Sequence, residues 1–349
     1  QWHDEAHGIR PNAWTRELHH AHGYPAVKER FHTPMMDDIV WKYPCNLSVL
    51  QHAQGVIVHS QASRNLAEHW YGRTFPKTWR RVPHLRAPVN ETNPTIAMRN
   101  ARRELGLPKN AFVVCSFGLL GPTKLNHRLL DAWLLSICER DHSCHLVFVG
   151  ENHGGSYGSE LATKIHERGL KARVLITGWA DEVVFHNYLL AADLAVQLRA
   201  LSRGETSGTV LDCMNYGLPT IVNANGSMAE LPRDAVWMLP DEFTDAELAD
   251  AMSKLYADVE RRMALGAKAR ESVRMNHSPS KCAKQYAEAI EGFHARARTG
   301  LAQVIREVAI LDHAPQDEAS WRRLAQALAM NHPLTTPKPR QLLVDVTAT

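Results

Sequence analysis

The sequence lacks the long apolar run that a membrane-spanning helix needs. No stretch approaches about 18 consecutive apolar residues, and the opening residues QWHDEAHGIR hold no apolar segment of the kind found in signal peptides. An initiator Met is missing too, and these first residues read like the middle of a domain. We therefore expect a cytoplasmic protein whose N-terminal domain is truncated in this chain.

Paired cysteines and metal-binding motifs are also missing. The sequence has no C-x-x-C pair among its six cysteines, which are Cys45, Cys115, Cys138, Cys144, Cys213 and Cys282. Several of them lie in apolar surroundings, which favours buried free thiols in a reducing compartment over disulfides or zinc. None of the 20 histidines has H-E-x-x-H spacing. We expect no metal site.

The sequence also lacks a large excess of charge of one sign. The net charge is +3 with neutral histidines, too small by itself to indicate binding to nucleic acid. Hydrophobic residues make up 44% of the chain and charged residues 22%, a composition typical of soluble globular proteins. A length of 349 residues favours two domains.

What the sequence does contain is an alternation of short apolar strands and helices. The expected strands are 111–118, 145–150, 173–178, 193–199 and 218–224, and the expected helices are 126–140, 158–169, 181–192 and 209–217. This alternation predicts βαβ units, and hence a parallel sheet covered by helices on both faces. Ligands bind beyond the carboxyl ends of such strands, so the loops after the first four strands should share one rim.

The flanking regions are less regular. A strand is expected at 55–60, followed by a helix starting near Ser60 or Ser63, and the proline-rich stretch 75–95 predicts a linker. The pattern is helical after about residue 240; TTPKPR then indicates a second linker, and QLLVDVTAT resembles the first strand of a further module. We expect a partial N-terminal domain at 1–90, a second domain at 91–275, a crossing helix at 276–299 and a tail at 300–349.

The first candidate site on the rim is SFGLLGPTKLNH. Gly118 and Gly121 permit an unusual backbone, and Lys124 follows at the entrance of the next helix. Backbone amides and one mobile cation suit a diphosphate. A surface lysine is the simpler interpretation. The G-x-x-x-x-G-K-[ST] pattern of nucleoside triphosphatases is not present.

The second candidate is SRGETSGTVLD. Gly204 and Gly208 bracket Glu205, Thr206 and Ser207 just before a helix, whose dipole favours anions. Carboxylates such as Glu205 and Asp212, one or two turns further on, can accept hydrogen bonds from the hydroxyls of a sugar or a ribose. Alternatively, Thr206 or Ser207 simply caps the helix and Asp212 is solvated. Both interpretations can hold together.

Two weaker candidates complete the rim. Gly178 ends a strand, and Trp179 could then stack on a nucleobase or pack in the core. Near the N-terminus, His3 next to Asp4 suggests an oriented hydrogen-bonding or proton-transfer group. A histidine in such a position is more often structural.

Longer segments of the chain follow one another in an order that resembles a known family. They are SFGLLGPTKLNHRLLDAW, HLVFVGEN, RVLITGWADEVVFHNYLLAADLAVQL, RGETSGTVLDCMNYGLPTIVNANGSMAELP and NHSPSKCAKQYAEAI. Together they resemble glycosyltransferase family 4, retaining enzymes of group 1 with the GT-B fold. The resemblance covers about 112–295 well and about 40–90 moderately. It implies an α/β protein with two Rossmann-like domains, of parallel sheets facing a cleft, the N-terminal one incomplete here.

The resemblance also implies roles for individual residues. Lys124 matches the lysine on the donor diphosphate, and His3 matches the central histidine near the donor sugar. Glu205 resembles the first acid of the E-x7-E motif, which faces the donor sugar, and Asp212 the second, which holds the ribose. The implied donor-binding residues are Gly118, Gly121, Lys124, Gly178, Trp179, Arg203, Glu205, Thr206, Ser207, Gly208 and Asp212, with His3 and Glu205 implied as catalytic.

Two departures from the family pattern matter. The acids here are spaced E-x6-D, so counting back from Asp212 places Gly204 where the family has its first Glu. Leu119 also stands where the family often has a second diphosphate-binding cation, the Arg of G-R-x-x-x-x-K. Arg199, Arg203 or Arg128 could replace that cation.

The resemblance implies a hexosyl-type transferase that uses a nucleotide-sugar donor, needs no metal or other cofactor, and retains the anomeric configuration. The implied acceptor is a glycan or lipid-linked glycan in surface polysaccharide assembly, with peripheral association at the inner face of the membrane. We expect no nucleic acid partner, and an additional catalytic module on the C-terminal side. Two alternatives remain open: a sugar-nucleotide isomerase of the 2-epimerase type, and a non-catalytic nucleotide-sugar-binding module of a larger protein.

Overall fold

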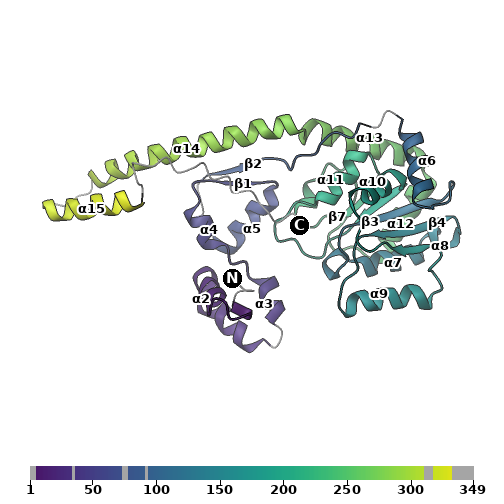
Figure 1. Ribbon diagram of the computed structural model, residues 1–349, viewed down its shortest axis with the longest axis horizontal. Helices are drawn as coiled ribbons and strands as arrows, with labels where there is room; N and C mark the ends of the chain where they lie inside the picture. The colour runs from purple at the N-terminus through teal and green to yellow at the C-terminus, as the bar shows by residue number, and fades with distance from the viewer. Residues whose placement is uncertain (1–4, 34–35, 73–77, 91–92, 310–316, 332–349) are drawn as a thin grey trace. The chain divides into compact units, whose positions relative to one another are not determined.

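The computed structural model describes residues 5–33, 36–72, 78–90, 93–309 and 317–331 (Figure 1). The chain divides into two compact units. The first takes its described residues from 1–58, 67–81 and 284–346, and the second from 59–66 and 82–283. None of the helices in the described ranges combines the length and the apolar character needed to cross a membrane.

The first unit is mostly helical. Its elements are α2 (Ala13–His32), α3 (Met36–Lys42), α4 (Leu47–His52), β1 (Val56–Val58), the end of α5 (Gln61–Tyr71), β2 (Trp79–Arg81), most of α14 (Pro279–Ala309), and α15 (Glu318–Asn331). A small core formed by Trp14, Leu18, Ala26 and Ile39 joins α2 to α3. Phe293 of α14 packs over Gly55, where a Cβ atom would lie 2.4 Å from the phenyl ring.

One expectation for this region is wrong in part. The stretch 75–95 was expected to be a linker, yet β2 lies within it and pairs in parallel with β1, from Val56 opposite Trp79 to Val58 opposite Arg81. Three residues between prolines are too few to show a periodic pattern, so the strand depends on its distant partner rather than on local sequence. The helix expected near Ser60 is confirmed: α5 starts at Gln61, and the Ser60 hydroxyl accepts a hydrogen bond from the Ser63 amide at 3.2 Å.

The second unit contains the expected parallel sheet. Its strands are β3 (Phe112–Phe117), β4 (Cys144–Val149), β5 (Val174–Ile176), β6 (Leu194–Gln197), β7 (Thr220–Asn223) and β8 (Trp237–Leu239). They lie in the order β5-β4-β3-β6-β7-β8, and all neighbouring pairs are parallel. The strand order reverses between β3 and β6. The first five strands of this unit were expected from the sequence, and β8 was not.

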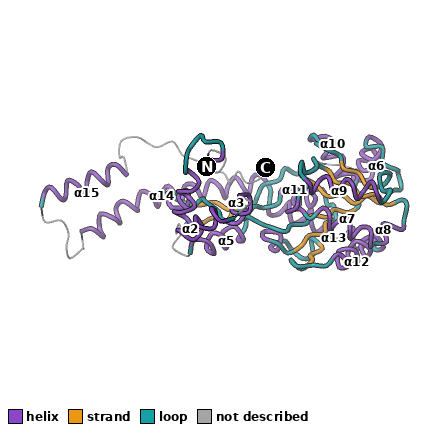
Figure 2. Tube along the Cα trace, turned by 90° about the horizontal axis from the view of Figure 1, so that it is seen from below, coloured by secondary structure: helices purple, strands orange, loops and turns teal. Residues whose placement is uncertain are grey.

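Helices cover both faces of this sheet, as expected. They are α6 (Pro94–Glu104), α7 (Asn126–Leu135), α8 (Ile137–Arg140), α9 (Ser156–Glu167), α10 (Glu182–Ala191), α11 (Gly208–Tyr216), α12 (Asp245–Ala257) and α13 (Val259–Asn276). The single helix expected at 126–140 is split at Ser136, whose hydroxyl accepts from the Cys138 amide at 3.3 Å. In Figure 2 the strands of this unit lie between α10 and α12.

Alternating residues of β3 explain why the sheet is buried on both sides. Val114 belongs to a cluster with Trp133 of α7, whereas Val113 and Phe117 belong to another with Tyr188 of α10. Successive side chains of a strand point to opposite faces, so a strand covered twice must be apolar throughout. All six cysteines are free: Cys45 is half-buried and the other five are buried, as expected.

A largely buried ion pair, whose arginine and aspartate side chains are 8% and 20% exposed, joins α6 to the amino end of β6. Arg102 lies 2.6 Å from the Asp193 carboxylate, and its other donors bind the carbonyl oxygens of Ala191 and Lys109, each at 3.0 Å. The same carboxylate oxygen accepts the Val113 amide at 2.8 Å. Because Asp193 precedes β6, this network lies at the amino ends of the strands. The rim with the candidate site lies at their carboxyl ends.

Candidate active site

The candidate site lies where the strand order reverses. Backbone pairing joins Val114 to Leu194 and Cys115 to Ala195, and beyond these pairs the buried Gln197 side chain continues the contact. Its amide oxygen accepts from the Phe117 backbone N at 2.8 Å, and its nitrogen donates to the Phe117 carbonyl at 3.3 Å. The loops after β3 and β6 leave the sheet here in different directions, which is the place where open parallel sheets bind ligands.

The loop after β3 uses its two glycines differently from what we expected. Gly118 has a φ of 102°, and it lies so close to Gly150 that a Cβ atom on Gly150 would be 2.2 Å from the Gly118 carbonyl oxygen. Gly121, with a φ of 174°, is extended and needs no unusual backbone. Its amide instead donates to the Asn126 side chain at 3.0 Å, which fixes the turn leading to Lys124.

Lys124 comes together with Arg199 and Glu205, from loops about 80 residues apart in the chain. The Ala200 amide donates to the Thr123 carbonyl at 3.0 Å, which joins the two loops directly. Burial, with the positive charge of Arg199, lowers the pKa of Lys124 to about 7, and Glu205 opposes this effect. Two cations that repel one another beside a single carboxylate form a site that an anion would stabilise.

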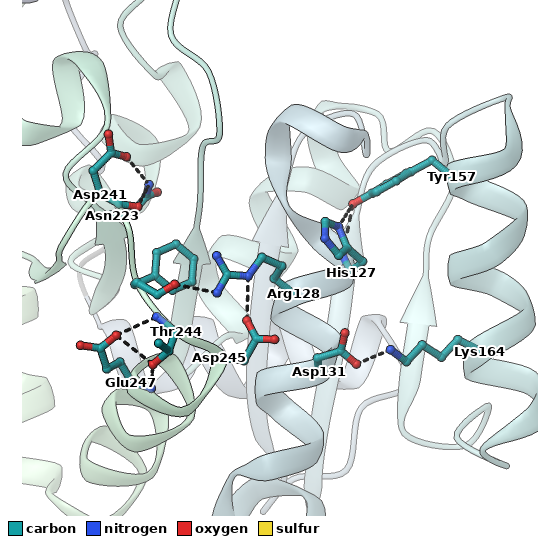
Figure 3. A network of polar contacts seen from close by, with 11 residues as sticks. His127, Arg128, Asp131, Tyr157, Lys164, Asn223, Asp241, Thr244, Asp245 and Glu247 are labelled. Atoms are coloured by element: carbon teal, nitrogen blue, oxygen red, sulfur yellow. Dashed lines mark hydrogen bonds and ion pairs between the residues drawn. The ribbon is translucent and has the colours of Figure 1, made fainter.

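Arg199 is held by Asn223, the last residue of β7. The Asn223 side chain accepts from the Arg199 amide at 2.9 Å and donates to the Arg199 carbonyl at 2.8 Å. Asn223 is itself fixed by a hydrogen bond of 3.1 Å to Asp241 (Figure 3). Asn223 was not among the residues predicted from the sequence. An amide at the end of a buried strand does indicate a polar network, since a buried polar side chain must find partners.

The structure distinguishes the three arginines that could replace the cation missing at position 119. Leu119 itself is 56% exposed. Arg128 binds the Asp245 carboxylate and the Phe243 carbonyl, each at 2.7 Å (Figure 3). Arg203 is exposed. Arg199 is buried, and burial lowers its pKa to about 10, while Glu205 opposes the shift. Of the three, Arg199 is the one whose charge acts on Lys124.

In the stretch Ser202–Asp212, backbone geometry accounts for the shifted spacing of the acids. Gly204 has a φ of 98°, which disfavours a side chain, and a Cβ atom there would lie 3.3 Å from the Ser63 Cα. A glutamate at 204 would therefore be strained. The Glu205 carboxylate accepts the Arg203 amide at 2.7 Å, and the Glu205 carbonyl accepts from the Ser227 hydroxyl at 2.8 Å.

The helix that follows is capped by Ser207, one of the two expected residues. Its hydroxyl accepts from the Val210 amide at 3.4 Å and from the Arg199 guanidinium at 3.1 Å. The hydroxyl of Thr206, the other candidate, is buried and makes no hydrogen bond within the described part of the chain. The cap and the cation are thus parts of one network.

Asp212 is not simply solvated, which was the alternative interpretation of this residue. It forms an ion pair with Arg86, with 2.7 Å between the arginine Nε and the Asp212 Oδ1. Burial raises the pKa of Asp212, and the Arg86 charge opposes that rise. Arg86 comes from the stretch after β2 and was not among the candidate residues. No local pattern marks it, because its partner is far away in the chain.

The remaining candidates are placed as follows. Gly178 follows β5 with a φ of 73°, and Trp179 is 77% exposed. The core interpretation of Trp179 is therefore wrong, and stacking on a base stays a prediction. His3 and its neighbour Asp4 lie outside the described residues. Within the described ranges, no group of three or more His, Cys, Asp or Glu side chains is placed to hold a metal ion.

The model of the family described as glycosyl transferases group 1 matches residues 97–272, about half of the chain. The chain belongs to this family. The match includes every strand of the sheet and the residues Lys124, Arg199, Glu205 and Asp212.

Two curated members of the family are similar in sequence. A GDP-mannose-dependent alpha-(1-6)-phosphatidylinositol monomannoside mannosyltransferase of Mycobacterium tuberculosis is 32% identical over 184 residues, which is 51% of this chain and 46% of that protein. D-inositol 3-phosphate glycosyltransferase of Thermobispora bispora is 29% identical over 210 residues, 57% of this chain and 48% of that protein. The chain thus spans about half the length of the curated relatives it matches.

A solved structure supports the fold. Anabaena HepE, crystallised with UDP and glucose, superposes with a TM-score of 0.61 at 22% identity, over 70% of this chain and 65% of that one. The expected GT-B fold class is confirmed.

Proposed function

We propose that the chain transfers a sugar from a nucleotide-activated donor to an acceptor hydroxyl, with retention of configuration. One observation carries this proposal. At the point where the strand order reverses, the Ala200 amide joins the loop of Lys124 to the loop of Arg199 and Glu205, and the Arg199 guanidinium donates to the Ser207 hydroxyl at the start of α11. A diphosphate needs cations and backbone donors, and a sugar needs a carboxylate nearby. The family's group 1 transferases and the names of the similar proteins support the same reaction class.

Each group has a defined part in this proposal. Lys124 binds the diphosphate, and Arg199 adds a second positive charge beside it. The amino end of α11 contributes its dipole to the leaving phosphate. Glu205 accepts hydrogen bonds from hydroxyls of the donor sugar, and Asp212 accepts those of the ribose. Protein charges then take the place of a metal ion at the leaving group.

The donor is a nucleoside diphosphate sugar, for which UDP and GDP are the first two bases to test. HepE was crystallised with UDP and glucose, and the mycobacterial relative is named for GDP-mannose. In this proposal 91–275 binds the donor and 1–90 lies on the acceptor side. We propose a glycan or lipid-linked glycan acceptor, at the inner face of the membrane.

A thermal-shift panel with UDP, GDP, dTDP and their sugars tests the proposal. A ligand at 100 times its dissociation constant should stabilise the folded chain by about 2.7 kcal/mol. We expect one nucleotide and its sugars to give this shift, with or without EDTA. A shift that appears only with added Mn²⁺ or Mg²⁺ contradicts metal independence. Nucleotide release that needs no acceptor favours an isomerase, and binding without turnover favours a non-catalytic module.

Substitutions of the two acids should have different effects on binding. Glu205→Ala should weaken binding of the nucleotide sugar but not of the free diphosphate, because only the former carries the hydroxyls that Glu205 meets. Asp212→Asn should weaken both, because both contain ribose. A buried polar group left without its partner costs about 1–3 kcal/mol, so calorimetry should resolve each change.

The exposed Glu167 at the end of α9 provides the control: Glu167→Ala should leave both affinities unchanged. If Glu205→Ala keeps the wild-type affinity for the nucleotide sugar and normal turnover, Glu205 merely shapes the loop before the Ser207 cap.

A further inference from the structure

The segment after β2 lies along one face of α11. The Arg86 guanidinium donates to the Gly208 carbonyl at 2.8 Å and pairs with Asp212 at 2.7 Å. One turn further along the helix, the Asn215 side chain donates to the Ala87 carbonyl at 2.8 Å. Positions 208, 212 and 215 are spaced by four and three residues, so they share one face of the helix.

Gly208 leaves the room that Arg86 occupies. A Cβ atom on Gly208 would lie 2.8 Å from the Nη2 of Arg86, closer than such atoms approach. The second glycine of SRGETSGTVLD thus gives the arginine room against the first turn of α11. Its role in donor binding stays a prediction.

Arg86 is fixed on its other sides as well. Its amide donates to the His277 carbonyl at 2.8 Å, and its Nη1 lies 2.8 Å from the Leu85 carbonyl and 2.6 Å from the Nδ1 of His84. Only 13% of its side chain is exposed. A guanidinium held by this many partners keeps its position, and its charge therefore stays beside the Asp212 carboxylate, 2.7 Å from Oδ1.

Asp212 keeps part of its hydrogen-bonding capacity. Arg86 engages Oδ1, and within the part of the chain that the structure describes no hydrogen bond is made by Oδ2. The side chain is 31% exposed. An ionised carboxylate can accept about four hydrogen bonds, so the pair with Arg86 leaves acceptors for a diol.

We propose that Arg86 is a positioning residue for ribose recognition: it holds Asp212 ionised, with the acceptor edge of the carboxylate turned toward the diol of the nucleotide. This inference rests on the proposed function, which gives Asp212 its ribose. It adds a residue from outside the rim loops, on the stretch after β2, which belongs to the same unit as Asp212. Without the guanidinium, the half-buried carboxyl group is free to rotate or to take up a proton.

The test compares UDP and GDP with their 2′,3′-dideoxy forms by calorimetry. The wild-type chain should prefer one ribonucleotide over its dideoxy form by about tenfold or more, since the diol pairs a partly buried carboxylate. Arg86→Met should remove most of this preference while leaving the affinity for the dideoxy form nearly unchanged. Arg86→Lys, which keeps the charge but not the fork of donors, should restore part of it.

Arg128→Met is the matched control. Arg128 faces Asp245 with the same 2.7 Å between Nε and Oδ1, and Asp245 is 33% exposed. This variant should keep the wild-type preference for the ribonucleotide. If Arg86→Met does not fold, the partial loss expected of Arg86→Lys decides the matter in the same assay.

The remaining outcomes separate the possible errors. An unchanged preference in Arg86→Met overturns the inference, and so does an equal loss of both affinities, which indicates a purely structural role. If the wild-type chain binds ribo and dideoxy forms equally, Asp212 does not meet the ribose and the inference fails with the site intact. If it binds neither UDP nor GDP in either form, the proposed function fails, and the inference with it.

Discussion

Lys124→Ala is expected to weaken the binding of UDP or GDP by roughly 10- to 100-fold, because a hydrogen bond to a charged group contributes about 1.5–3 kcal/mol. The effect should be large for a single lysine because Lys124 is half-buried and has no hydrogen-bonded partner for its ammonium group among the described residues. The fold should survive the change, since Lys124 lies in a short turn, η1 (Pro122–Lys124), outside the core.

The pH dependence should identify this lysine. Burial and Arg199 lower its pKa to about 7, so the free protein carries the charge below that pH and loses it above. A bound diphosphate favours the charged form, so binding above pH 7 must take up a proton. Wild-type affinity should therefore fall as the pH rises through 7 toward 9, and Lys124→Ala should show a much flatter profile.

Calorimetry in buffers of different ionisation enthalpy measures that proton directly. Lys164→Ala is a suitable control, because Lys164 lies on α9 and pairs with Asp131 (Figure 3). It should keep both the wild-type affinity and the proton uptake. Equal affinities in wild type and Lys124→Ala at pH 6.5 would remove Lys124 from the site, and proton uptake that persists in Lys124→Ala would assign the titration to another group.

The second large effect concerns stability. Arg102→Ala should lower the free energy of unfolding by about 3–5 kcal/mol, since removing one partner of a buried ion pair leaves the other charge uncompensated. Burial already raises the pKa of Asp193, against the lowering effect of Arg102. The variant also loses the hydrogen bonds that Arg102 donates to the carbonyl oxygens of Ala191 and Lys109.

Urea unfolding followed by circular dichroism checks this expectation. Lys254→Ala is the control in the same unit, since its ion pair with Asp250 on α12 is exposed on both sides; it should cost less than about 1 kcal/mol. Adding Asp193→Asn to the arginine variant should recover part of the loss. A loss below about 1 kcal/mol in Arg102→Ala would mean that water replaces the guanidinium.

The pattern of the chain determined much of the donor-side fold. Strands such as β3 and β4 are mostly apolar and are followed by glycines, which predicts strands buried on both faces of a parallel sheet. The helix expected at 209–217 ends at Gly217, which has a φ of 69°. The Ser207 cap and the rim of loops were predicted in the same way, because helix ends and strand periodicity depend on residues that are close in the sequence.

What the local pattern could not determine was which distant residues meet. Arg86 reaches Asp212 across 126 positions, and Asn223 holds Arg199 from the next strand of the sheet. The strand β2 pairs with β1, more than 20 residues earlier in the chain. Such pairs depend on strand order and on crossovers between strands, for which a residue's neighbours in sequence carry no signal. The sequence by itself therefore determined the strands, the helices and the rim of loops on which Lys124, Glu205 and Asp212 were predicted. Only the tertiary structure decided that Arg199 acts on Lys124 and that Arg86 pairs with Asp212.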